Sequence, residues 1–188
     1  APSKAKRVLF NGDVMTVAKD GFFIVGFDRD APASATLVAE MRDGTKQEKQ
    51  ISVAPGDWRI EKVNASITGG AKSEEEYNAV RDSEIAQMVA ARALGSNSEG
   101  WRQQFIWPVK GRISGLFGSQ RIYRGVPGSY HSGMDIAVPQ GTIFVAPADG
   151  VVTLAADTAF TLEGHMLIVD HGMGLGSAFL HCSQLLVK

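Results

Sequence analysis

The chain contains four histidines, and two of them stand beside residues with which they could do chemistry. His131 precedes Asp135 by four positions, and His181 stands next to Cys182, the single cysteine. An imidazole nitrogen and a carboxylate oxygen together suit zinc, which in catalytic sites keeps a third protein ligand and an open position for water. A surface histidine near an aspartate would show the same H-x-x-x-D spacing, so the spacing alone leaves both interpretations open.

The neighbours of this pair indicate a loop that leads into a strand. On a helix, a spacing of four residues would place both side chains on one face. Gly133, Val138 and Pro139 favour a loop instead, where an imidazole and a carboxylate can still converge on one ion. Cys182 and His181 are adjacent on an expected strand, so they point to opposite faces and are poorly placed to form a Cys–His nucleophile.

Residues 101–188 are rich in glycine and read as short strands, and five blocks of sequence stand out within residues 105–188. The blocks are Trp107–Val109 with Gly111–Gly118, His131–Thr142, Ala146–Val152, Gly164–Gly172 and Phe179–Ser183. In content and order they resemble the catalytic domain of the lysostaphin/LytM-type zinc peptidoglycan endopeptidases. The match includes an H-x-G-x-D-like block, a strand ending in Asp-His-Gly and a block similar to Tyr-x-His-Leu-Ser. Phe179 and Cys182 replace the usual Tyr and Leu of that last block.

The resemblance implies a role for each residue that matches a family motif. His131 and Asp135 match the first two zinc ligands, and His181 matches a histidine beside the metal that acts in proton transfer or polarisation. The third ligand of the family lies in a later His-x-His motif, which this sequence does not contain. His171 and His165 are interpreted as structural.

The resemblance also implies a function and a location. We expect a zinc metalloendopeptidase that hydrolyses peptide bonds of bacterial peptidoglycan, in the periplasm or exported. The 188-residue chain alone is expected to be inactive. A nicked protein, a truncated chain and a natural non-catalytic protein all remain open explanations for the ending. Expected partners are peptidoglycan peptides and the missing C-terminal segment as a separate chain.

Two other functions remain open at this stage. The first is a non-catalytic family member that activates a cell-wall amidase, although such proteins usually lose the ligands that remain here. The second is a carbohydrate or phospho-carrier module on a similar glycine-rich β fold, in which His181 would be the phosphorylated residue. That interpretation leaves the H-x-x-x-D block unexplained.

Composition narrows the class of protein. The 188 residues carry a net charge of −1, with 44% hydrophobic and 21% charged residues, as in a globular protein. The charge gives no reason to expect nucleic acid, and no apolar run approaches the roughly 20 residues that span a bilayer. A single cysteine excludes an intramolecular disulfide.

Turn signals divide the remaining sequence into elements that would position the site. Residues 1–68 read as an N-terminal β module, a small β-sandwich with turns at Asn11-Gly12, Asp20-Gly21 and Asp43-Gly44 and a strand over Phe22–Phe27. Residues 69–100 form a linking helix and linker that open with a capping box at Ser73–Glu76. Residues 101–188 form the antiparallel β catalytic domain. The expected core stripe of the helix is Tyr77, Val80, Ile85, Met88, Val89 and Leu94.

Overall fold

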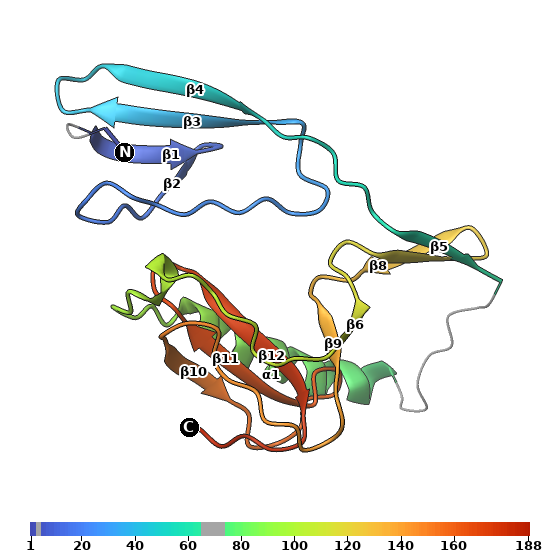
Figure 1. The fold of residues 1–188 in the computed structure, drawn as a ribbon. Helices are drawn as coiled ribbons and strands as arrows, with labels where there is room; N and C mark the ends of the chain where they lie inside the picture. Colours follow the sequence, from blue (N-terminus) through green and yellow to red (C-terminus); the bar gives the residue numbers. More distant parts are fainter. Residues whose placement is uncertain (3–4, 65–73) are drawn as a thin grey trace. The chain divides into compact units, whose positions relative to one another are not determined.

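The computed structural model covers the whole chain and describes residues 1–2, 5–64 and 74–188, the first three of the helix by backbone alone. Contacts along the chain divide it into two compact units, residues 1–57 and 58–188. Both contain mainly antiparallel strands, and the described residues form one α-helix (Figure 1). The mostly-β class predicted from the sequence is therefore confirmed.

The first unit is a single antiparallel sheet with the strand order β2-β1-β3-β4, coloured blue to cyan in Figure 1. Its strands are β1 (Ala5–Phe10), β2 (Asp13–Val14), β3 (Ser34–Met41) and β4 (Lys46–Ser52). Asn11 and Gly12 join β1 to β2 with φ angles of 51° and 95°, the left-handed pair that a tight hairpin turn requires. The hairpin predicted from Asn-Gly is therefore confirmed.

The predicted strand over Phe22–Phe27 is wrong, and the described part of the first unit holds one sheet rather than two. Residues 15–33 contain no strand. The amide of Ala18 donates to the carbonyl of Phe22 across the turn at Asp20-Gly21, so the run closes a local turn. Phe27 instead packs its ring edge-on against Phe10, with centroids 5.6 Å apart. β propensity alone does not make a strand when no partner offers a ladder.

In the second unit, the main sheet has the order β10-β11-β12, and α1 packs against β10 and β11. The elements are α1 (Glu74–Ala93), β10 (Val151–Ala155), β11 (His165–Asp170) and β12 (Gly176–Cys182). The core between helix and sheet contains Met88, Ala91, Ala156, Phe160, Met166 and Ile168. The helix predicted to link two domains is thus an integral layer of the second unit.

The face that α1 buries differs from the predicted stripe. Met88 is buried as expected, but Val80, Ile85, Val89 and Leu94 are each more than 40% exposed. Glu84 and Ala91 are buried in their place. The predicted capping box at Ser73–Glu76 lies outside the residues whose side chains the structure describes.

Two smaller sheets complete the second unit. One has the order β5-β7-β8, from β5 (Ile60–Val63), β7 (Gln120–Tyr123) and β8 (Val126–Tyr130), and the other pairs β6 (Arg112–Gly115) with β9 (Asp135–Ala137). A short 3-10 helix spans Gly100–Arg102. β5 pairs in parallel with β7, so residues that the sequence placed in the N-terminal module belong to the second unit. No helix within the described ranges has the length and apolar character needed to cross a membrane.

Candidate metal-binding pair

The backbone of His131 is held on both sides directly after β8. Its amide donates to the carbonyl of Ser119, and its carbonyl accepts from the amide of Gly118, both at 2.8 Å. Gly118 has a φ of 82°, a conformation that favours glycine. The loop around Gly118 therefore fixes where the His131 side chain begins.

The side chains of His131 and Asp135 meet, as the sequence predicts for a shared ion. The His131 Nε2 atom lies 3.1 Å from the Asp135 Oδ1 atom, and the His131 Nδ1 atom lies 3.1 Å from the carbonyl oxygen of Leu116. Both ring nitrogens thus face acceptors, and neither a carboxylate nor a carbonyl can donate a hydrogen. A cation between Nε2 and Oδ1 would satisfy both atoms.

Gly115 forms the floor under this pair. It lies opposite Asp135 in the β6–β9 ladder. A Cβ atom built on Gly115 would collide with the Asp135 carboxylate and approach His131 Cε1 to 3.1 Å. Only a residue without a side chain allows the two groups to converge here. The sequence interpretation did not assign Gly115 a role, although its signal was present in the glycine-rich block Gly111–Gly118.

The geometry of the pair fits two adjacent zinc donors. Zn–N and Zn–O bonds of about 2.1 Å at a tetrahedral angle place the two donor atoms about 3.4 Å apart, close to the 3.1 Å between Nε2 and Oδ1. The Leu116 carbonyl orients the ring as partners of metal-binding histidines do. The side chains of His131 and Asp135 are 33% and 57% exposed, so solvent reaches them. The described residues contain no group of three or more His, Cys, Asp or Glu that could hold a metal.

His181 lies on β12 and is exposed. It is not brought into a group of metal ligands with His131 and Asp135 among the described residues. Its φ is 59°, which is unusual for a strand residue with a side chain. Its amide donates to the carbonyl of Glu163 at 2.7 Å.

The other two histidines have structural environments. His171 is fully buried, with Nδ1 2.8 Å from the carbonyl oxygen of Asp149 and Nε2 2.8 Å from the hydroxyl of Ser177. Both ring nitrogens are therefore satisfied inside the core. His165 places Nδ1 3.2 Å from the carbonyl oxygen of Ala156. Burial raises the pKa of the Cys182 thiol, which makes it a poor nucleophile.

Residues 129–188, which include the His131–Asp135 pair, match the family described as peptidase family M23. This part of the chain is an M23 domain. A crystal structure of a candidate M23 peptidase from Pseudomonas aeruginosa matches with a TM-score of 0.64 at 25% identity, covering 97% of this chain and 68% of that one.

Curated relatives carry both enzyme and activator names. The chain is 34% identical over 104 residues to the cell division protein DipM of Caulobacter vibrioides, covering 55% of this chain and 16% of that protein. It is 34% identical over 88 residues to the peptidoglycan DD-endopeptidase ShyA of Vibrio cholerae, covering 44% of this chain and 19% of that protein. It is 30% identical over 126 residues to the murein hydrolase activator NlpD of Salmonella dublin, covering 67% of this chain and 28% of that protein. The matched regions thus span between about a sixth and somewhat over a quarter of these relatives.

Proposed function

We propose that the second unit is the zinc-binding domain of a metallopeptidase that hydrolyses peptide bonds of bacterial peptidoglycan. The observation that supports this most directly is the His131–Asp135 pair seated on Gly115. Its donor types and its Nε2–Oδ1 distance of 3.1 Å suit zinc, and the loop of His131 and the β6–β9 ladder bring the two side chains together.

The roles of the residues follow from their contacts. His131 Nε2 and Asp135 Oδ1 would hold the zinc ion, while the Leu116 carbonyl keeps the imidazole ring oriented through Nδ1. Bound zinc would supply a Lewis acid and a water of lowered pKa. His181 would move a proton at its imidazole during peptide hydrolysis, because its exposed side chain is free to face a substrate. A third donor for zinc would come from a segment or chain outside the described residues.

The substrate and location follow from the relatives rather than from the pair. ShyA is named for endopeptidase activity on peptidoglycan, and NlpD for activation of murein hydrolases. We therefore infer that this protein acts on peptidoglycan peptides, in the periplasm or outside the cell.

A second candidate function is activation of a separate cell-wall hydrolase. It is favoured by the finding that the described residues gather only two donors and by the match to NlpD over 67% of this chain. An activator would use the same fold to bind a protein, without needing zinc.

Zinc stoichiometry tests the proposal and separates the two candidates. We expect about one zinc per protein, by elemental analysis after dialysis, when the third donor is supplied, and a loss of at least about tenfold in zinc affinity in His131→Ala and Asp135→Ala. His165→Gln, which changes a histidine outside the pair, is the matched control and should retain zinc. Zinc-free protein that still stimulates a purified amidase would favour the activator.

A further inference from the structure

The backbone of His181 is held in a conformation that strands do not normally adopt. Its φ of 59° lies in the left-handed region, which is costly for residues other than glycine and persists only where the surroundings hold it. Strained backbone of this kind gathers at functional sites. The structure therefore requires a contact that keeps His181 in place.

His181 lies in a β-bulge of β12. In the β11–β12 ladder, Leu167 pairs with Phe179 and His165 pairs with Cys182. The two β11 residues are two positions apart, whereas their β12 partners are three positions apart. One extra residue is thus inserted where His181 stands. A bulge of this kind bends a strand and redirects a side chain, and bulges are frequent beside active sites.

The contact that holds the bulge comes from the turn before β11. The His181 amide donates to the carbonyl of Glu163 at 2.7 Å. The turn is closed by two hydrogen bonds between the backbones of Phe160 and Gly164, at 2.9 and 3.0 Å. The position of Glu163 therefore decides where the His181 amide is held.

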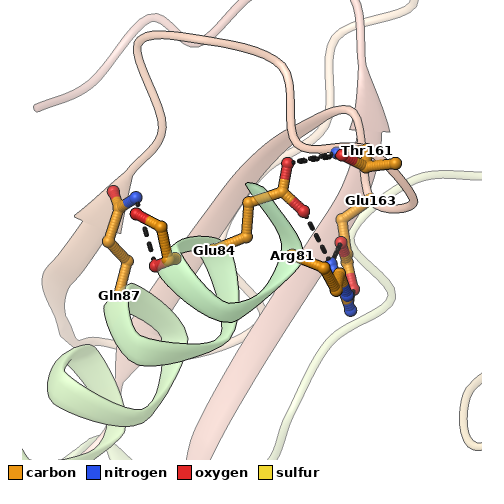
Figure 2. A network of polar contacts seen from close by, with 6 residues as sticks. Arg81, Glu84, Gln87, Thr161 and Glu163 are labelled. Atoms are coloured by element: carbon orange, nitrogen blue, oxygen red, sulfur yellow. Dashed lines mark hydrogen bonds and ion pairs between the residues drawn. The ribbon is translucent and has the colours of Figure 1, made fainter. Parts of the chain in front are cut away.

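Two residues of α1 form hydrogen bonds with the side chains and the backbone of this turn (Figure 2). Arg81 contacts both carboxylate oxygens of Glu163 at 2.6 Å and one oxygen of Glu84 at 3.0 Å. The other Glu84 oxygen accepts from the amide and hydroxyl of Thr161, at 2.6 and 2.8 Å. We call Arg81, Glu84, Thr161 and Glu163 the helix clasp.

The helix clasp is shielded from water and charged. The side chains of Arg81, Glu84 and Glu163 are 16%, 7% and 12% exposed. The hydrogen bond from Arg81 lowers the pKa of Glu163. Burial raises the pKa of Glu84. Hydrogen bonds from Thr161 and Arg81 together lower it by more than burial raises it, so the net shift of this pKa is downward. Two-pronged contacts between arginine and carboxylate fix orientation as well as distance.

We propose that Arg81 is a positioning residue for His181, acting through the carboxylate and the carbonyl of Glu163. The helix outside the peptidase match thereby sets the backbone of the residue that the proposed function assigns to proton transfer. The proton-transfer role of His181 in this inference rests on the proposed function. The coupling between Arg81 and the backbone of His181 rests on the described contacts alone.

The coupling is tested by NMR of the full chain with Arg81→Met and Glu163→Gln. The readouts are the Cα and Cβ chemical shifts of His181, which report a positive φ, and the exchange rate of its amide. In Arg81→Met we expect both shifts to move toward ordinary strand values and the His181 amide to exchange at least about tenfold faster relative to Ala178 of β12. Arg81→Lys, which keeps the charge but loses the two-pronged contact, should give an intermediate change.

Two controls separate positioning from general loosening. Met88→Ala opens the core between α1 and the sheet without touching the helix clasp, and Arg92→Met removes an exposed charge from the same helix. The proposal is overturned if His181 keeps its shifts in Arg81→Met, or if Met88→Ala moves them equally at a comparable loss of stability.

Hydrolysis separates this inference from the proposed function. If the zinc-loaded protein cleaves peptidoglycan, Arg81→Met should lower kcat about tenfold or more with little change in KM, and an unchanged kcat would overturn positioning. If the wild type does not cleave peptidoglycan even when the third zinc donor is supplied, the proposed function fails, and the His181 shifts still decide whether Arg81 positions that residue.

Discussion

Each unit of the molecule contains an arginine that contacts a glutamate, but the two groups differ in what they join. In the first unit, Glu40 on β3 contacts Arg7 on β1 and Lys46 on β4. The Arg7 and Lys46 side chains are 51% and 66% exposed, while that of Glu40 is 18% exposed. In the second unit, Arg81 and Glu163 are 16% and 12% exposed and join α1 to a turn 82 residues away in sequence.

The difference shows that the contribution of an ion pair to stability depends on whether other contacts already join the two elements that it connects. β1, β3 and β4 are already joined by their ladders, so the exposed group adds little, and water screens it. No ladder joins α1 to the turn at residues 160–164. The helix clasp and the apolar core with Met88 are what connect the two.

The largest predicted loss of stability comes from breaking the helix clasp. Arg81→Met leaves two shielded carboxylates without their cation, and should destabilise the second unit by about 3 kcal/mol, the low end for a broken buried pair. Urea unfolding followed by tryptophan fluorescence measures this unit alone, because Trp58, Trp101 and Trp107 all lie within it.

The matched control for this prediction is Arg92→Met, which removes an exposed arginine about three turns further along α1. It should shift the unfolding midpoint far less than Arg81→Met. Equal shifts would mean that helix charge, and not the helix clasp, accounts for the stability.

The second prediction concerns a pair of intermediate exposure, because His131 and Asp135 are 33% and 57% exposed and join a loop to β9. Gly115→Ala places a methyl group against the Asp135 carboxylate, which can turn away and so abandon His131. We expect zinc affinity to fall by about tenfold or more while tryptophan fluorescence still reports a folded unit. Calorimetric titration with zinc measures the loss.

Gly133→Ala is the control for Gly115→Ala. Gly133 lies between the two donors in sequence, but a Cβ atom there meets nothing within 4 Å. Its zinc affinity should therefore stay near that of the wild type. A loss as large as in Gly115→Ala would indicate a general sensitivity of the loop rather than a role for Gly115.

Acid should weaken the helix clasp selectively. The folded-state pKa of Glu163, lowered by the hydrogen bond from Arg81, lies below its unfolded value, and the net shift of Glu84 is also downward. Their contribution is therefore fully present above about pH 4.3, the ordinary glutamate value, and is lost as pH falls through the folded pKa. The charged groups of the clasp are Arg81 and Glu84 on α1 and Glu163 on the turn.

The measurement is the unfolding free energy of the second unit between pH 6 and pH 3, in wild type and Arg81→Met. The difference between them should be largest near pH 6 and shrink toward pH 3. A difference that stays constant down to pH 3 would contradict the assignment of the clasp as the source of the stability.

The sequence predicted local features well where chemistry or turn geometry leaves few choices. Asn11-Gly12 gave the β1–β2 hairpin, and the expected strand ending in Asp-His-Gly corresponds to β11. The sequence also led us to expect the side chains of His131 and Asp135 close together, and the structure brings them within 3.1 Å.

The errors arose where a partner far away in sequence decides the outcome. Periodicity placed Ile85 and Val89 in the core, but α1 buries Glu84 and largely shields Arg81 instead, because Thr161 and Glu163 satisfy them. No local pattern announces such a pairing across more than 75 residues. The bulge at His181 was missed for the same reason, since it depends on the register with β11.

The smallest predicted effect is in the exposed group of the first unit. The hydrogen bond from Arg7, followed by that from Lys46, lowers the pKa of Glu40 to about 2. Glu40→Gln should nevertheless shift the unfolding midpoint of the first unit by less than about a third of the shift that Arg81→Met causes in the second. Because the first unit has no tryptophan, the loss of the amide signals of Val8 and Ala39 in urea would report its unfolding.

Two results would show that the group of Arg7, Glu40 and Lys46 contributes to stability as the helix clasp does. One is a midpoint shift in Glu40→Gln as large as that in Arg81→Met. The other is a shift that persists in 1 M salt, where the Debye length falls to about 3 Å and exposed pairs are screened. A small, salt-sensitive shift together with a carboxyl titration near pH 2 would show that the strongly lowered pKa of a glutamate with exposed cationic partners reports local contact and contributes little to stability.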